Sequence, residues 1–280
     1  MNGFYHLETG RCGGSLFELS RAVDRSPIAA AQLDRPIVRD AAAARQRGDA
    51  GHMGGWNMEG RIDTLEASQA YRDTLRECVR RMPPELRDVY DRYAGQLVCL
   101  DASFPGTSHF SPAEGGFRVN ETADLANPFG AGNAFFHESA HVLDYLMGRE
   151  HGTDGISMVY RLTEAAEADL EDALSSIMGA EGCSYEEAQG KLSAELASHM
   201  KESACVSDVF GGLTGNRVVG ISGHSADYWA LRGRDAVGRE AFAEITADSA
   251  CNPAVLAYTQ KMMPRTYAAY QRIMEKGGRV

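Results

Sequence analysis

Three side chains that can together hold and use a metal ion lie on one short stretch of the sequence. His137 and His141 stand four residues apart with Glu138 between them, in the pattern H-E-x-x-H. On a helix, residues four apart differ by only about 40° around the axis, so both imidazoles can reach one metal ion. A carboxylate between them can accept a proton from a metal-bound water. The pattern therefore predicts a zinc site with Glu138 as general base.

The stretch that carries this pattern is predicted to be a buried helix. Gly130 and Gly132 interrupt the chain just before Asn133, which is a favourable N-cap residue, and Gly148 stands where a glycine would end the helix. Apolar residues supply a surface that would pack against a core: Phe135, Phe136, Ala140, Leu143, Leu146 and Met147. The alternative is an accidental pattern on an ordinary amphipathic helix.

A second apolar stretch, residues 239–247, carries two carboxylates that a metal site would explain. Glu240 and Glu244 are four residues apart, hence on one helix face. Burying such a face is costly unless the charges have partners. A metal and its histidines are suitable partners, since one glutamate can bind the ion and the other can accept the outer N–H of an imidazole. The alternative is an exposed stripe on a surface helix.

Taken together, the two motifs resemble the gluzincin type of zinc metallopeptidase. The first continues as H-E-x-x-H-x-x-D, ending at Asp144, and the second reads E-x-F-A-E. The combination is similar to the catalytic domain of anthrax lethal factor. The intervening Gly223-His224 and Tyr228-Trp229 are similar to predicted peptidases of phages and bacteria. The match covers roughly residues 97 to 250 in scattered motifs, and the segment between the motifs is longer here than in lethal factor.

The resemblance implies a role for each residue of the two motifs. Glu138 would be the general base of a zinc-dependent hydrolysis. The implied zinc ligands are His137, His141 and Glu240, and the implied outer carboxylates are Glu244 and Asp144. Asp154, in a segment faintly similar to the aspzincins, is a lower-ranked third ligand because its spacing from His141 differs from theirs.

Two side chains that precede the predicted helix of Glu240 and Glu244 are candidates for stabilising the transition state. Negative charge develops on a carbonyl oxygen when water adds to it, and a hydrogen-bond donor there favours the reaction. His224 and Tyr228 are the available donors, in a segment predicted to be a loop in the cleft wall. Tyr228 is preferred because its phenol stays protonated to about pH 10. The alternative role of the Tyr228-Trp229 pair is packing.

Composition limits the classes of partner and compartment. The chain has 280 residues and a net charge of -11, which argues against a nucleic-acid-binding or anionic-membrane surface. No apolar run is long enough to span a bilayer, and the first residues do not form a secretory signal. We therefore expect a cytoplasmic protein, with export by another route left open. Six cysteines are scattered singly and are expected to be reduced: Cys12, Cys78, Cys99, Cys183, Cys205 and Cys251.

The predicted fold is α+β, a mostly helical zincin-like domain over residues 62–280 that follows a loosely structured arm over residues 1–61. Hydrophobic periodicity predicts further helices over 62–82, 84–95, 157–178, 184–209, 239–249 and 254–275, the last broken at Pro264. Strands over 97–100 and 116–120 are expected to form a small antiparallel sheet beside the metal helix, and a loop and short strand are expected over 211–220.

The function that the sequence favours is that of a zinc-dependent peptidase acting on a peptide or protein substrate. One alternative is a metal-stabilised structural or assembly module, such as a phage-associated protein, without turnover. Glu138 favours the enzyme, because a structural site needs no base beside the metal and closes its coordination with a fourth protein ligand. Another alternative is an amidase acting on a non-protein amide.

Overall fold

The fold is known for residues 57–279, which the computed structural model describes. Most of the predicted N-terminal arm lies outside the described residues. The first helix of the described residues, α4 (Met58–Asp63), begins four residues before the expected domain boundary, and its Met58 and Ile62 are fully buried in the core. The structure is 68% helical with a small three-stranded sheet, which confirms the α+β, mostly helical fold class.

The helices after α4 follow in chain order. They are α5 (Gln69–Arg81), α6 (Pro84–Tyr93), the 3-10 helix η1 (Ala94–Gln96), α7 (Glu121–Leu125), α8 (Asn133–Glu150), α9 (Ile156–Val159), α10 (Leu162–Glu181), α11 (Tyr185–Ser198), α12 (Ala204–Thr214), α13 (Ala226–Arg232), α14 (Asp235–Cys251), α15 (Pro253–Met262) and α16 (Pro264–Lys276). The three strands of the sheet lie between η1 and α7 and are β1 (Cys99–Asp101), β2 (His109–Ser111) and β3 (Gly116–Arg118).

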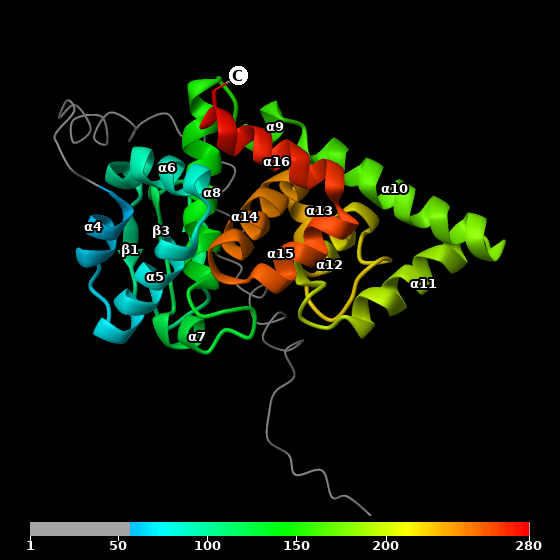
Figure 1. The fold of residues 1–280 in the computed structure, drawn as a ribbon, viewed down its shortest axis with the longest axis horizontal. Coiled ribbons are helices and arrows are strands. Elements are labelled where there is room, and N and C mark those ends of the chain that lie inside the picture. The colour runs from blue at the N-terminus through cyan, green and yellow to red at the C-terminus, as the bar shows by residue number, and fades with distance from the viewer. Residues whose placement is uncertain (1–56, 280) are drawn as a thin grey trace, which may run out of the picture.

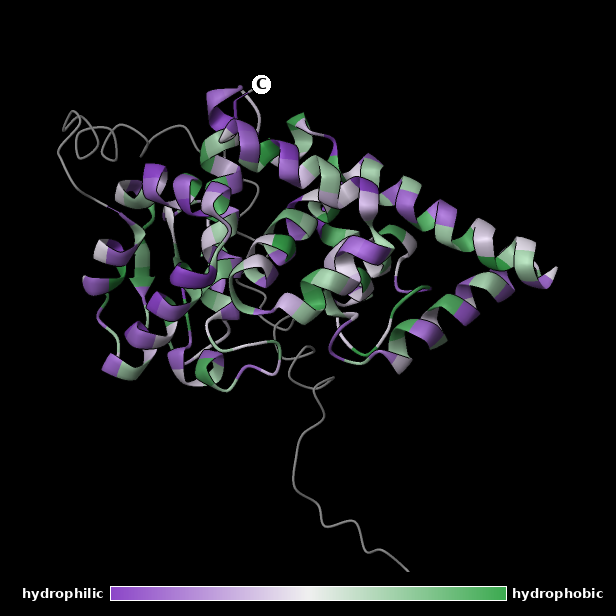
Figure 2. Cartoon of the chain, in the orientation of Figure 1, coloured by the Kyte–Doolittle hydropathy of each residue, from purple (hydrophilic) through white to green (hydrophobic). Residues whose placement is uncertain are grey.

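Helix α8, which carries the H-E-x-x-H motif, stands between two parts of the fold (Figure 1). The sheet and helices α4 to α7 lie on one side of it, and helices α10 to α16 lie on the other. Helix α14 packs directly against α8, and the largest fully buried side chains include Phe135 and Phe136 of α8 and Phe242 of α14. Most helices carry both polar and apolar stripes (Figure 2), as expected of helices that bury one face.

The sheet is mixed rather than antiparallel as expected. Its strand order is β1-β3-β2, with β1 parallel to β3 and β2 antiparallel to β3. The sequence reading missed β2, which is only three residues long and includes polar His109 and Ser111. Because this extra strand reverses the chain between β1 and β3, those two strands run in the same direction.

Several expected helices are divided or extended by local capping. The helix expected over 62–82 is two helices, because Ser68 caps α5 by accepting a hydrogen bond from the Tyr71 N–H. Residues 157–178 are likewise divided by Arg161, which adopts a left-handed conformation at φ 57°. The expected loop and strand over 211–220 are wrong, because α12 runs on to Thr214 and the described residues contain no strand there.

The ends of α8 are fixed by tertiary contacts and not by the residues that the sequence suggested. Asn133 is the first helical residue and Gly132, at φ 90°, is the cap. The buried carboxylate of Asp124 accepts hydrogen bonds from the N–H groups of Ala134 and Phe135, at 2.8 and 3.1 Å. It thereby satisfies two of the donors that every helix leaves open at its start.

Gly148 does not end α8, which continues to Glu150. A Cβ atom at Gly148 would lie 2.5 Å from backbone atoms of Gly155, just ahead of α9. The glycine is therefore explained by the close approach of a neighbouring backbone, which a periodicity argument does not detect.

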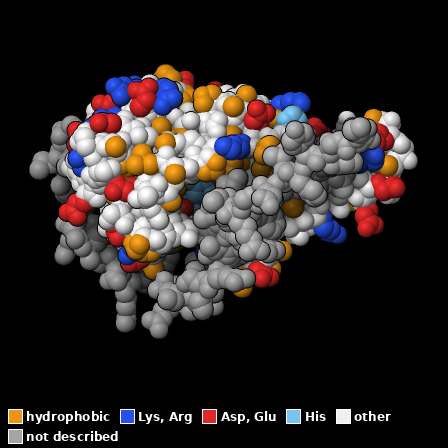
Figure 3. Space-filling view, turned by 90° about the horizontal axis from the view of Figure 1, so that it is seen from below, with side chains coloured by type: hydrophobic (Ala, Val, Ile, Leu, Met, Phe, Trp, Pro, Cys, Tyr) orange, Lys and Arg blue, Asp and Glu red, His pale blue; other side chains and the backbone are white. Residues whose placement is uncertain are grey.

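The surface matches the mixed composition of the sequence. Acidic and basic side chains are interspersed on the face shown in Figure 3. None of the helices between residues 57 and 279 combines the length and the apolar character needed to cross a membrane.

We expect Gly148→Ala to destabilise the protein by about 1–3 kcal/mol, because the added methyl group meets backbone atoms that must move. Thermal or urea unfolding measures the change. Gly190→Ala is the matched control, since Gly190 lies within α11 with open space around it, and it should be neutral or stabilising by up to about 1 kcal/mol. Equal stabilities of the two variants would contradict this account of Gly148.

Candidate metal centre

Three donor atoms from α8 and α14 converge on one point. His137 and His141 project from one face of α8, and their Nε2 atoms lie 3.2 Å apart. The Oε2 atom of Glu240, from α14, lies 3.3 Å from each of these nitrogens. The three atoms thus form a nearly equilateral triangle. The structure brings together the three residues that the sequence predicted as ligands.

The size of this triangle fits zinc. Donor atoms of a tetrahedral zinc site with bonds of about 2.0–2.1 Å lie about 3.3–3.4 Å from one another. The Oε2 atom of Glu240 is buried and receives no hydrogen bond within residues 57–279. Two neutral imidazoles can share at most one proton between their facing nitrogens. A cation at the centre would satisfy all three atoms at once, so the donor set fits the metal.

The charges of these groups are strongly interdependent. Burial alone lowers the pKa of the His137 imidazole, but its contact with Glu240 and the charge of Glu244 outweigh burial and raise the pKa to about 10. Burial alone raises the pKa of Glu240, but the charge of His141 and the other histidines hold it well below its usual range. Without a metal, the imidazolium of His137 therefore neutralises the buried carboxylate.

Glu244 lies one helical turn beyond Glu240 and faces the outer side of a predicted ligand. Its Oε1 atom is 3.5 Å from Nδ1 of His137. Burial raises the pKa of Glu244, although the charge of His137 opposes the rise. A carboxylate in this place can orient the ring of a metal-binding histidine. This is the position that the sequence predicted for Glu244.

Among the described residues, the two other predicted acidic residues form no hydrogen bond or ion pair with the candidate ligands, although the charge of His141 acts on the pKa of Asp144. Asp144 is buried, but its carboxylate accepts the N–H and hydroxyl of Ser157, at 2.7 and 3.0 Å, at the start of α9. Burial raises the pKa of Asp144 to about 6. It joins α8 to α9 and makes no hydrogen bond to His141 within the described chain. Asp154 is exposed and belongs to no group of potential ligands among the described residues.

A buried aspartate that the sequence reading missed holds His224. Asp208, on α12, lies with both carboxylate oxygens 3.0 Å from Nδ1 of His224, and it also accepts the backbone N–H of that residue. The sequence contains one sign of this aspartate's role, namely a single carboxylate in the largely apolar segment 206–210. Burying a charge there is costly unless it has a partner. The Nε2 atom is left as the ring atom of His224 able to contact a ligand.

Tyr228 lies on a short helix, α13, and not on the expected loop. Its ring stacks on that of His224, with centroids 4.0 Å apart, and its phenol donates a hydrogen bond to Oε1 of Glu240. Burial and the charge of Glu240 raise the pKa of Tyr228 well above its usual value, so the phenol remains a donor. Tyr228 therefore fixes the orientation of the Glu240 carboxylate and leaves Oε2 facing the histidines.

Asp208, His224 and Glu240 form a second group whose donor atoms lie close enough to hold a metal ion. These atoms already have partners, however. The oxygens of Asp208 bind His224, and Oε1 of Glu240 accepts the phenol of Tyr228. We therefore interpret this group as an orienting network around the first site.

Glu138 remains available for chemistry. Its side chain is partly exposed, and it forms no hydrogen bond or ion pair with another residue of the described chain. Nearby, Phe110 of β2 stacks over His141 with ring centroids 6.4 Å apart and an angle of 16° between the planes. The edge strand β2 of the sheet thus lies beside α8.

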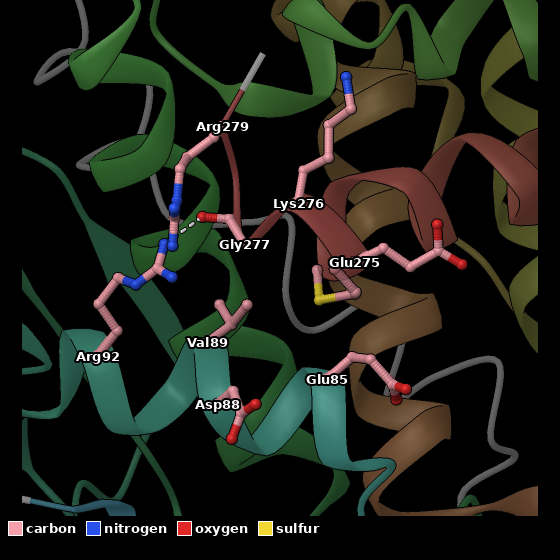
Figure 4. Close-up of a pocket in the computed structure, with 9 residues that line it drawn as sticks. Glu85, Asp88, Val89, Arg92, Glu275, Lys276, Gly277 and Arg279 are labelled. Carbon is pink, nitrogen blue, oxygen red and sulfur yellow. Dashed lines mark hydrogen bonds between the residues drawn. The ribbon is translucent and has the colours of Figure 1, made fainter.

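A surface pocket of about 450 Å³ lies away from this site, between α6 and the end of α16 (Figure 4). Its lining mixes acidic and basic side chains, namely Glu85, Asp88, Glu275, Arg92, Lys276 and Arg279. It includes no residue of either sequence motif.

Comparison with known proteins identifies no relative. No protein-family model, curated protein or solved structure matches the chain.

The two glutamates of α14 should differ in their effect on zinc binding. We expect Glu240→Gln to weaken zinc affinity by more than 100-fold, because it removes an anionic ligand atom from the triangle. Glu244→Gln, which removes only a partner of His137 Nδ1, should weaken it by about 10–100-fold or less. Competition titration with a chromophoric chelator measures both. A larger loss in Glu244→Gln would exchange the two roles.

Proposed function

We propose that this protein is a zinc-dependent metallopeptidase that hydrolyses peptide bonds. One observation carries the proposal: three ligand atoms at zinc spacing converge from α8 and α14, and Glu138, next to His137 on α8, has no hydrogen-bonded or ion-paired partner within residues 57–279. His137, His141 and Glu240 would hold the ion. Among the described residues no fourth side chain joins this ligand group, so a coordination position is left open, as in catalytic zinc sites.

The proposed chemistry divides between the ion and the side chains around it. Zinc in such a site polarises a carbonyl group and lowers the pKa of water toward about 7. Glu138 accepts the proton of the attacking water and later passes it to the leaving amine. Its lack of a hydrogen-bonded partner within the described chain leaves both carboxylate oxygens able to do so.

His224 is the better placed of the two candidate oxyanion donors. Tyr228 was preferred from the sequence, but its phenol is already engaged with Glu240. Asp208 fixes the ring of His224 through Nδ1 and leaves Nε2 for an incoming group. We therefore assign His224 to the developing negative charge on the carbonyl oxygen, and Tyr228 to the orientation of Glu240.

An extended peptide or protein segment is the proposed substrate. Strand β2 is an outer strand of the sheet and packs beside α8. An outer strand offers backbone N–H and C=O groups with which an extended chain can pair, and its Phe110 reaches over His141. This support favours a peptide over a small non-protein amide. The free Glu138 carboxylate favours turnover over a metal-stabilised structural module.

We expect Glu138→Gln to retain zinc and folding but to lose hydrolysis by about 10²–10⁴-fold, because an amide cannot accept the proton of the attacking water. The zinc-loaded full chain is assayed on casein and on a mixture of quenched fluorescent peptides of varied sequence. Zinc content and melting temperature are measured in parallel.

Glu164→Gln, at a partly exposed residue of α10 that pairs with Arg161, is the matched control and should keep full activity. Undiminished hydrolysis by Glu138→Gln would remove that residue from the mechanism. Absence of any cleavage by the zinc-loaded wild-type protein would contradict the peptidase assignment and favour the structural module.

A further inference from the structure

Two cysteines that are 173 residues apart in the sequence meet in the fold. Cys78 lies on α5 and Cys251 is the last residue of α14, and their sulfur atoms are 3.3 Å apart. In the reduced protein the thiol of Cys251 donates a hydrogen bond to the sulfur of Cys78. The sequence, in which all cysteines stand singly, gave no sign of this pair.

The pair lies where the start of α8 meets the end of α14. A Cβ atom at Gly132, the cap of α8, would be 3.3 Å from the sulfur of Cys78 and 3.6 Å from that of Cys251. One at Gly130 would be 3.1 Å from the backbone oxygen of Cys251. The glycines thus leave room beside both sulfur atoms. Helices α5, α8 and α14 meet at this point.

The two thiols differ in exposure and in acidity. Cys251 is partly exposed, whereas Cys78 is buried. The hydrogen bond from Cys251 lowers the pKa of Cys78, against the effect of burial, and the charge of Arg81 adds to the lowering. Burial raises the pKa of Cys251 well above its usual value. Cys78 is therefore the better thiolate of the two.

We propose that Cys78 and Cys251 are a redox-active pair that forms a reversible disulfide with peroxide as oxidant. Peroxide oxidises the thiolate of one cysteine of the pair to a sulfenic acid, with loss of hydroxide. The thiol of the other cysteine then attacks that sulfur, forms the S–S bond and releases water. The net reaction consumes two thiols and one peroxide and yields one disulfide and two waters.

The geometry requires little movement for this bond to form. A disulfide has a sulfur separation of about 2.05 Å, so the two atoms must approach by a little more than about 1 Å. The bond closes a loop of 173 residues, and long loops give the largest loss of entropy in the unfolded chain. Oxidation therefore fastens α5 to the end of α14 and stabilises the folded protein. This inference does not depend on the proposed peptidase activity.

Peptide mapping of the full chain tests the pair directly. The native protein is treated with hydrogen peroxide at low molar excess, alkylated, digested with trypsin without reduction and analysed by mass spectrometry. We expect a linked species of peptides 77–80 and 240–261, which contain Cys78 and Cys251. Dithiothreitol should restore two alkylatable thiols. If both cysteines are still alkylated after peroxide treatment, or pair with other cysteines instead, the inference is wrong.

Stability measurements on matched variants provide an independent test. Oxidation should raise the melting temperature of the wild-type protein by about 5 °C or more. The same treatment should leave that of Cys251→Ser unchanged. Cys183→Ser, which removes a thiol between α10 and α11, should respond as wild type. An unchanged or lower melting temperature of oxidised wild-type protein would contradict a disulfide that the native fold accommodates.

Discussion

The fold of this protein depends on keeping the buried carboxylate of Glu240 neutralised. This side chain is 5% exposed and lies on a helix whose neighbouring residues Ala241, Phe242 and Ala243 are fully buried. A single buried charge is costly unless it is paired. The partners are the imidazoles of α8 and the phenol of Tyr228. Because α8 must pack on α14 for its imidazoles to reach Glu240, the same contact determines both the helix packing and the electrostatics of the site.

That constraint explains how other elements are arranged around the two helices. Asp124 fixes the start of α8 through its backbone N–H groups, and Asp144 joins its later turns to α9. Asp208 fixes His224, on the other side of Glu240. Each of these aspartates is nearly inaccessible and accepts hydrogen bonds with defined geometry. Buried and fully bonded polar groups of this kind favour one arrangement of packed helices over its alternatives.

Sequence reasoning predicted the features that depend only on residues close together in the chain. The two histidines are spaced four apart, as are the two glutamates, so helix geometry alone predicted that each pair shares a face, and the structure agrees. It failed where partners are distant in the chain. Three features that were missed depend on tertiary contacts. They are the hydrogen bond between Asp208 and His224, strand β2, and the contact between Cys78 and Cys251. Gly148 was misread for the same reason, since a glycine needed for close packing looks like one that ends a helix.

The proposed function requires Glu240 and the two histidines of α8 to bind one zinc ion. The most direct measurement is a crystal structure of the zinc-loaded protein with anomalous data collected on both sides of the zinc absorption edge. We expect one strong anomalous peak at about 2.0–2.2 Å from Nε2 of His137, Nε2 of His141 and a carboxylate oxygen of Glu240. A zinc peak coordinated by Asp208 and His224 instead, or no peak at this site in crystals grown with zinc, would contradict it.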